Sequence, residues 1–231
     1  MFPLKDDNPT TRTPILTILL ILVNVFVFFL EATVPSEARE TIITTYALIP
    51  ARLASGEPSA IAGLFTSQFL HGGLLHVGSN MLYLWIFGNN IEDQLGRWRF
   101  LPFYLGCGAA AGLAQMLADP SSTIPTIGAS GAVAGILGAY ALLFPRARVY
   151  TVVLVFVFLR IIPVPAALWL GIWFLLQAGS AVVTRGSAGA GGVAWWAHLG
   201  GFAIGFLLIW LLRPRRRRPP DAMFEGAPWM R

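Results

Sequence analysis

Long apolar stretches separated by short polar connections dominate this chain. Six of the stretches are close to the roughly twenty residues that an α-helix needs to cross a hydrocarbon core of about 30 Å. They cover residues 14–32, 74–91, 99–118, 127–143, 165–183 and 193–212. Because each is apolar over most of its length, the pattern predicts an all-α membrane protein in which residues 14–212 form a bundle of six transmembrane helices.

Two segments lie outside this pattern. The run from Val149 to Ile162 is apolar, but it has only 14 residues, contains Arg160 and is followed by Pro163 and Pro165. It is too short to span and proline ends helices, so we expect it to lie along the membrane interface. The connection over residues 31–73 is predicted to hold short helices on the outer leaflet, because structureless loops of that length are uncommon.

Composition and charge support the membrane interpretation. The chain is 56% hydrophobic and 12% charged, with a mean hydropathy of +0.68, which excludes an ordinary soluble domain. Six spans put both termini on one side, and of the sixteen Lys and Arg residues only Arg39, Arg52 and Arg185 fall on the other side. Because basic connections stay inside, this asymmetry predicts that both termini are cytoplasmic.

The two ends of the chain flank the predicted bundle. Residues 1–13 are expected to form a cytoplasmic N-terminal segment, and residues 213–231 a basic, flexible cytoplasmic tail. Much of the positive charge lies in this tail, at Arg213 and Arg215–Arg218, directly after the last span. There it indicates contact with anionic membrane lipids rather than with nucleic acid.

Polar side chains capable of chemistry occur at similar depth in three spans. With the termini inside, the second, fourth and sixth spans run inward, so His76, Asn80, Ser130 and His198 all lie in outer halves. A polar group in lipid is costly unless it faces another polar group or a water-filled cavity. The sequence therefore predicts a shared pocket below the outer surface, with a serine nucleophile and a histidine base.

Glycine spacing suggests how the serine and histidine helices meet. Gly131 and Gly135 form one G-x-x-x-G pair after Ser130, and Gly201 and Gly205 form another after His198. Small residues at this spacing allow two helix backbones to approach closely. We predict that these four residues and Gly128 serve helix packing.

Several short motifs occur in a fixed order along the chain, and as a set they are specific. It comprises His71-x-x-x-x-His76-x-x-x-Asn80, Gly128-Ala129-Ser130-Gly131, Ala197-His198-x-x-Gly201-x-x-x-Gly205, and Gly88-Asn89-Asn90-Ile91-Glu92-Asp93 with Leu95-Gly96. In this order and at these depths, the motifs resemble the rhomboid family of intramembrane serine proteases. The resemblance covers roughly residues 14–212 and implies a rhomboid-like six-helix bundle.

The resemblance also implies an activity and its residues. Ser130 would be the nucleophile and His198 the general base, with His76, Asn80 and the Ser130 backbone N–H stabilising the oxyanion. The expected partners are transmembrane protein substrates, cut near their outer ends, and membrane lipids. We expect no cofactor, no metal and no nucleic acid, and the chain to be a multi-pass protein of the bacterial cell (inner) membrane. The oligomeric state cannot be read from the sequence.

Acidic residues favour a Ser–His dyad over a triad. No Asp or Glu occurs between Asp119 and Asp221, so neither the serine helix nor the histidine helix carries a carboxylate. The family often has an aromatic residue one turn after the serine, where this chain has Ala134. What orients the His198 ring is therefore open. Trp195, Trp196 and Tyr140 are the candidates.

Two other functions remain open. A catalytically silent relative would bind membrane segments, although such proteins usually lack the serine or the histidine, and both are retained here. A metal-dependent membrane hydrolase would use the chain's only histidines, His71, His76 and His198, as zinc ligands. The five-residue step from His71 to His76 suits a helical pair of ligands less well than a step of four.

Overall fold

The computed structural model describes residues 2–184 and 193–212, and most of them are helical. The helices are α1 (Ile15–Thr33), α2 (Ser36–Tyr46), α3 (Pro50–Ala54), α4 (Ala60–Thr66), η1 (Ser67–Phe69), α5 (Leu74–Tyr83), η2 (Leu84–Gly88), α6 (Asn89–Leu95), α7 (Arg97–Ala118), α8 (Ser130–Leu143), α9 (Ala166–Val183) and α10 (Trp195–Leu212). The strands are β1 (Phe2–Asp6), β2 (Arg148–Val155) and β3 (Phe158–Pro165). The predicted tail, residues 213–231, lies outside the described residues.

Helices occur at all six predicted places, but they are not equally long. Among the described residues, α1, α7, α9 and α10 are long and apolar enough to cross a membrane. Helix α8 has 14 residues, because the backbone before Ser130 is not helical. The second predicted span is a series of three segments, α5, η2 and α6, with a π-helical turn in the middle. Length therefore does not confirm the count of six spans.

The all-α prediction is wrong in one respect, because the chain contains a small antiparallel sheet in the order β1-β2-β3. The run that begins at Val149 is rich in β-branched residues, and Pro163 and Pro165 prevent it from continuing as a helix. It folds back on itself as a hairpin, and the N-terminal segment adds β1, with Asp6 opposite Val149. Part of residues 1–13 is therefore a strand.

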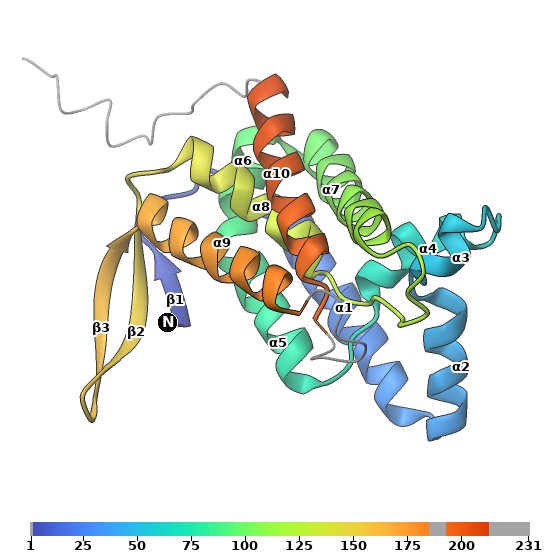
Figure 1. Ribbon diagram of the computed structural model, residues 1–231. Helices are drawn as coiled ribbons and strands as arrows, with labels where there is room; N and C mark the ends of the chain where they lie inside the picture. The colour runs from blue at the N-terminus through green and yellow to red at the C-terminus, as the bar shows by residue number, and fades with distance from the viewer. Residues whose placement is uncertain (1, 185–192, 213–231) are drawn as a thin grey trace, which may run out of the picture.

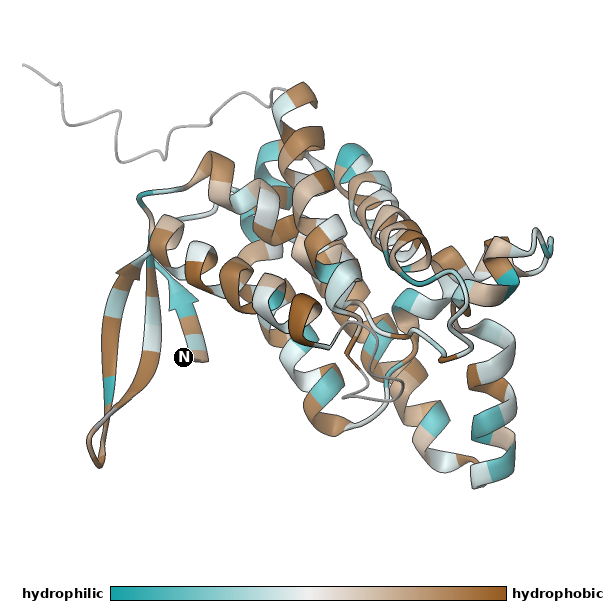
Figure 2. Cartoon of the chain, viewed as in Figure 1, coloured by the Kyte–Doolittle hydropathy of each residue, from teal (hydrophilic) through white to brown (hydrophobic). Residues whose placement is uncertain are grey.

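The β2–β3 hairpin projects from one flank of the bundle next to α9 (Figure 1). Its outer half is strongly apolar (Figure 2), and Phe156 and Val157 at its end are 92% and 83% exposed. Contiguous apolar patches are rare on soluble monomers and mark contact with a partner or a membrane. The hairpin surface is thus compatible with the predicted interfacial position.

Helix α8 is the buried centre of the bundle, and it packs closely against α10. A Cβ added to Gly201 would lie 2.2 Å from the carbonyl oxygen of Gly131, and one added to Gly205 would lie 2.0 Å from that of Gly135. On the opposite side, a Cβ on Gly135 would lie 2.4 Å from the Cβ of Cys107 in α7. Glycine at these positions lets the backbones of α8 and α10 touch.

The start of α1 is capped by side chains from α6. The first N–H groups of a helix have no partner within it, and Pro14 at the N-cap provides none. The carboxylate of Glu92 accepts hydrogen bonds from the backbone N–H groups of Leu16 (3.0 Å) and Thr17 (2.7 Å). Asp93 accepts one from the hydroxyl of Thr11 (2.8 Å). These two buried acids join α1 to α6.

The C-terminal end of α8 is tied to β1. The hydroxyl of Tyr140 donates to the Asp6 carboxylate (2.5 Å), and the Asn90 amide donates to the same oxygen (2.9 Å). Burial raises the pKa of Asp6 from 3.8 to about 6, against a smaller lowering by the Tyr140 hydrogen bond. Folding thus favours the protonated acid, and this contribution to stability is complete below pH 3.8 and lost as the pH rises through about 6.

Asp6→Asn should therefore remove a pH-dependent penalty while keeping the acceptor for Tyr140. We expect the variant to gain stability relative to the wild type between pH 4 and pH 7, by at most about 3 kcal/mol and less where water screens the charge. Thermal unfolding in detergent at the two pH values measures this. Asp119→Asn, in an exposed loop, is the control. A constant difference at both pH values would contradict the assignment.

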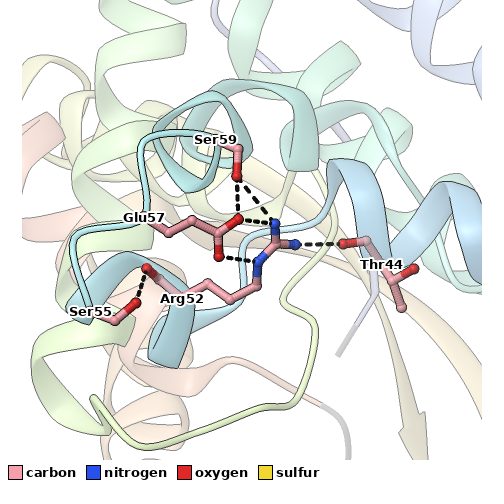
Figure 3. A network of polar contacts seen from close by, with 5 residues as sticks. All are labelled: Thr44, Arg52, Ser55, Glu57 and Ser59. Carbon is pink, nitrogen blue, oxygen red and sulfur yellow. Dashed lines mark hydrogen bonds and ion pairs between the residues drawn. The ribbon is translucent and has the colours of Figure 1, made fainter.

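The outer connection contains short helices, as predicted. Arg52 in α3 donates to both oxygens of Glu57, with Nε 2.7 Å from Oε2, and to the backbone carbonyl of Thr44 in α2 (3.0 Å) (Figure 3). These hydrogen bonds hold the pKa of Glu57 down, to about 2. The Arg52 network thereby fixes α2 and α3 relative to each other at the surface.

Candidate active site

Ser130 is the first residue of α8. The segment just before it is held in place by residues of the 31–73 connection. The backbone N–H of Gly128 donates to the carbonyl of Ser67 (2.9 Å), and Leu48 and Thr126 form an isolated β-bridge. Gly128 has φ +119°, in the region that favours glycine. It thus lies before α8 and sets the turn into it, and a Cβ there would meet the side chain of His76 in α5, so the packing role of Gly128 stays a prediction.

His198 of α10 lies directly opposite the serine. Its Nε2 is 2.8 Å from the Ser130 Oγ, although the two residues are 68 positions apart in the chain. Both side chains are partly buried. A serine hydroxyl donating to an unprotonated imidazole nitrogen is the arrangement that general-base activation requires.

The other ring nitrogen of His198 meets a residue that sequence analysis missed. Its Nδ1 is 2.7 Å from Oε1 of Gln177 in α9. The rings of Trp173 and Trp195 each lie 6.1 Å from the imidazole. Gln177 is the only carboxamide in the apolar stretch 165–183, and a carboxamide within a span was the signal that could have found it.

The three aromatic candidates for orienting His198 differ in position. Trp195 contacts the ring with its own ring perpendicular to it. Tyr140 instead binds Asp6 at the C-terminal end of α8. No ring contact joins Trp196 to His198 among the described residues, whereas Trp173, which was not proposed, lies over the imidazole at 36°.

His76 and Asn80 lie one turn apart on α5 and face the backbone before the serine. A Cβ on Gly128 would be 2.6 Å from His76 Nε2 and 3.6 Å from Asn80 Nδ2. His76 Nδ1 accepts a hydrogen bond from the Gly72 N–H (3.3 Å), which leaves the proton of the neutral ring on Nε2. The Asn80 amide nitrogen is buried without a hydrogen-bond partner in the described part of the chain. Two donors therefore converge beside Ser130.

His71 supports this backbone through its ring. Its Nε2 accepts a hydrogen bond from the Ala129 N–H (3.5 Å), and its ring packs edge-on against His76 at 5.1 Å. Burial, with a smaller effect from the charge of His76, lowers the pKa of His71 to about 4. Within residues 2–184 and 193–212, no three His, Cys, Asp or Glu side chains are grouped so that they could hold a metal ion.

A serine hydroxyl that faces a base, with two available N–H donors beside it, is the arrangement of a serine hydrolase. Here it is built where three helices of a membrane bundle meet. Its nucleophile, its base and its donors come from α8, α10 and α5, so the site exists only in the assembled bundle.

Comparison with known proteins identifies the family. The family model described as Rhomboid domain matches residues 58–215, so the chain belongs to the rhomboid family. It is an integral membrane protein.

Named relatives are similar to this chain over parts of their length. Rhomboid protein 1, mitochondrial, of Saccharomyces cerevisiae is 36% identical over 165 residues, 66% of this chain and 43% of that protein. Rhomboid protease GluP of Bacillus subtilis is 36% identical over 127 residues, 54% of this chain and 24% of that protein. The presenilin-associated rhomboid-like protein, mitochondrial, of Bos taurus is 30% identical over 204 residues, 84% of this chain and 46% of that protein. The chain spans half or less of the length of these relatives.

The same relatives bear on location. Two of the three carry mitochondrial names and one comes from a bacterium. The comparisons therefore support a membrane protein but not the narrower prediction of a bacterial inner membrane.

Proposed function

We propose that this chain is an intramembrane serine endopeptidase that cleaves transmembrane proteins near the extracytoplasmic side. The observation that carries the proposal is the 2.8 Å contact between Ser130 Oγ and His198 Nε2. The name of the relative Rhomboid protease GluP adds support. The proposal includes the six-span arrangement with both termini in the cytoplasm, which puts the site near the outer surface.

The dyad accounts for both halves of the reaction. His198 takes the hydroxyl proton as Ser130 Oγ bonds to the scissile carbonyl carbon, and it returns that proton to the leaving amine when the C–N bond breaks. A water molecule then attacks the acyl-enzyme, with His198 again taking its proton. The ester bond to Ser130 breaks, and the proton returns to the serine oxygen.

The N–H donors beside the serine stabilise the oxyanion. The negative oxygen of the tetrahedral intermediate needs preorganised N–H groups in a site with little water. The Asn80 amide, the His76 Nε2–H and the free N–H groups of the first turn of α8 are close enough to supply them. Because Asn80 Nδ2 has no hydrogen-bond partner among the described residues, it loses none of those bonds when the oxyanion forms.

Covalent labelling tests the proposal directly. A fluorophosphonate should react with purified wild-type protein in detergent, and peptide mapping should find the adduct on Ser130. Ser130→Ala should lose the label, and His198→Ala should lose most of it. Equal labelling of His198→Ala and wild type would contradict His198 as the activating base.

The zinc alternative predicts the opposite response to metal removal. If the three histidines held zinc, dialysis against a strong chelator would abolish substrate cleavage, and added zinc would restore it. The serine mechanism predicts full cleavage after the same dialysis. Chelator-sensitive cleavage restored by zinc would overturn the proposal.

Asn80→Ala should slow turnover without weakening substrate binding. Removing one oxyanion donor costs about 10²–10³ in kcat in soluble hydrolases, and less if His76 compensates. Steady-state cleavage of a fluorogenic transmembrane substrate in proteoliposomes separates kcat from KM. Gly78→Ala, where an added Cβ meets nothing within 4 Å, is the matched control on the same helix. A rise in KM with unchanged kcat would instead assign Asn80 to ground-state binding.

A further inference from the structure

Gln177 is a polar side chain directed inward from a helix that is otherwise apolar. Its neighbours Leu175 and Leu176 are 69% and 63% exposed and face outward, while Gln177 is partly buried. A carboxamide facing lipid is costly unless its polar atoms find partners. In this chain the partner is the candidate base, with Gln177 Oε1 2.7 Å from His198 Nδ1.

This hydrogen bond selects the form of His198 that can act as a base. An amide oxygen only accepts, so the shared proton is on Nδ1. Nε2 then carries the lone pair and accepts the Ser130 hydroxyl at 2.8 Å. The opposite tautomer would place a proton on Nε2 and leave the serine without an acceptor.

No acid in the described part of the chain is hydrogen-bonded to the ring to do the same work. The titratable groups facing His198 are Ser130 from α8 and His76 from α5. From α7, Gln115 accepts from the backbone N–H of Ala197 and is neutral. Trp173 and Trp195 limit the tilt of the ring but accept no proton. Ala134 is too small to support it.

We infer that Gln177 is a positioning residue that holds His198 in the orientation and tautomer that Ser130 requires. Together with Trp173, one turn earlier on α9, it takes the place of an aromatic side chain at position 134. The inference rests on the proposed serine-protease function. It adds a neutral third member to the dyad, from a helix that carries neither catalytic residue.

A neutral partner has a specific consequence for the pH dependence of catalysis. The Gln177 oxygen fixes the ring but brings no charge to stabilise the imidazolium. Glutamate in its place would keep an acceptor of the same length and add a negative charge beside the ring. An opposite charge at this distance shifts a titration by about one unit or more.

The first test is Gln177→Met, which keeps the length of the side chain and removes the acceptor. With the full-length protein in proteoliposomes and a fluorogenic transmembrane substrate, we expect kcat to fall about 10- to 100-fold with KM unchanged. This range does not exceed the lower end of the 10²–10⁴ that general-base catalysis contributes as a whole. Leu176→Met, on the exposed side of the same turn, should retain wild-type kcat. Wild-type kcat in Gln177→Met would overturn the inference.

The second test is Gln177→Glu, which tests the inference even if Gln177→Met fails to fold. The acidic limb of the kcat/KM profile should move to higher pH by about one unit, because the added carboxylate retains the proton on the ring. An acidic limb at the wild-type position would overturn the inference. Failure of the proposed function would appear separately, as wild-type cleavage by Ser130→Ala and His198→Ala.

Discussion

Ser130→Ala is expected to abolish substrate cleavage while the protein stays folded. The hydroxyl supplies the atom that bonds to the substrate, and removing a catalytic serine costs roughly 10⁴-fold or more in related chemistry. Its side chain is partly exposed and its hydrogen bond is to His198, so its loss leaves almost no void. Cleavage of a model transmembrane substrate by purified protein, together with a thermal melt, measures both effects.

The control for this variant is Ser79→Ala, an exposed serine on α5. It should cleave at the wild-type rate, which would show that replacing a serine in the membrane domain is not harmful in itself. Cleavage by Ser130→Ala at the wild-type rate would eliminate the serine mechanism, whatever the labelling experiments find.

Gly205→Ala is expected to have the second largest effect, through geometry rather than chemistry. The added methyl carbon would lie 2.0 Å from the carbonyl oxygen of Gly135, so α8 and α10 must separate. Overpacking of this kind typically costs 1–3 kcal/mol, and a displacement near 1 Å between catalytic groups can cost about a hundredfold in rate. We expect a lower midpoint of thermal unfolding and a fall in kcat of about that size.

Gly179→Ala provides the matched control. An added Cβ at Gly179 in α9 meets nothing within 4 Å, so this variant should keep its activity. Its stability should be unchanged or slightly higher, because alanine restricts the unfolded chain. Wild-type activity in Gly205→Ala would show that the α8–α10 contact does not set the distance between Ser130 and His198.

The sequence predicted the helical architecture well because a backbone in lipid must satisfy its own hydrogen bonds, which makes long apolar stretches helical. It could not predict the sheet, since β1 pairs with a strand more than 140 positions away and Phe2–Asp6 is too short to show a pattern of its own. The shortness of α8 was also missed, because hydropathy does not distinguish the non-helical residues before Ser130 from the helix that follows.

In the candidate site, too, the sequence predicted some residues and only the structure revealed others. Ser130, His198, His76 and Asn80 were named from their predicted depth and from the resemblance to rhomboid motifs, and the structure brings all four together. Gln177 was missed, since its contribution depends on which face of α9 turns inward. Gly128 was assigned to helix packing together with the G-x-x-x-G residues, and its positive φ adds a role in the turn before α8 that spacing does not reveal.

The ties that hold α1 and β1 to the bundle imply that the unit that folds is larger than the unit that homology recognises. The Rhomboid match begins at residue 58, after β1 and α1. A fragment cut at that boundary would leave the Glu92 carboxylate buried without the N–H groups of Leu16 and Thr17, and Tyr140 without Asp6. Shortened versions of the protein and comparisons across the family should therefore keep the first 33 residues, even though no catalytic group lies among them.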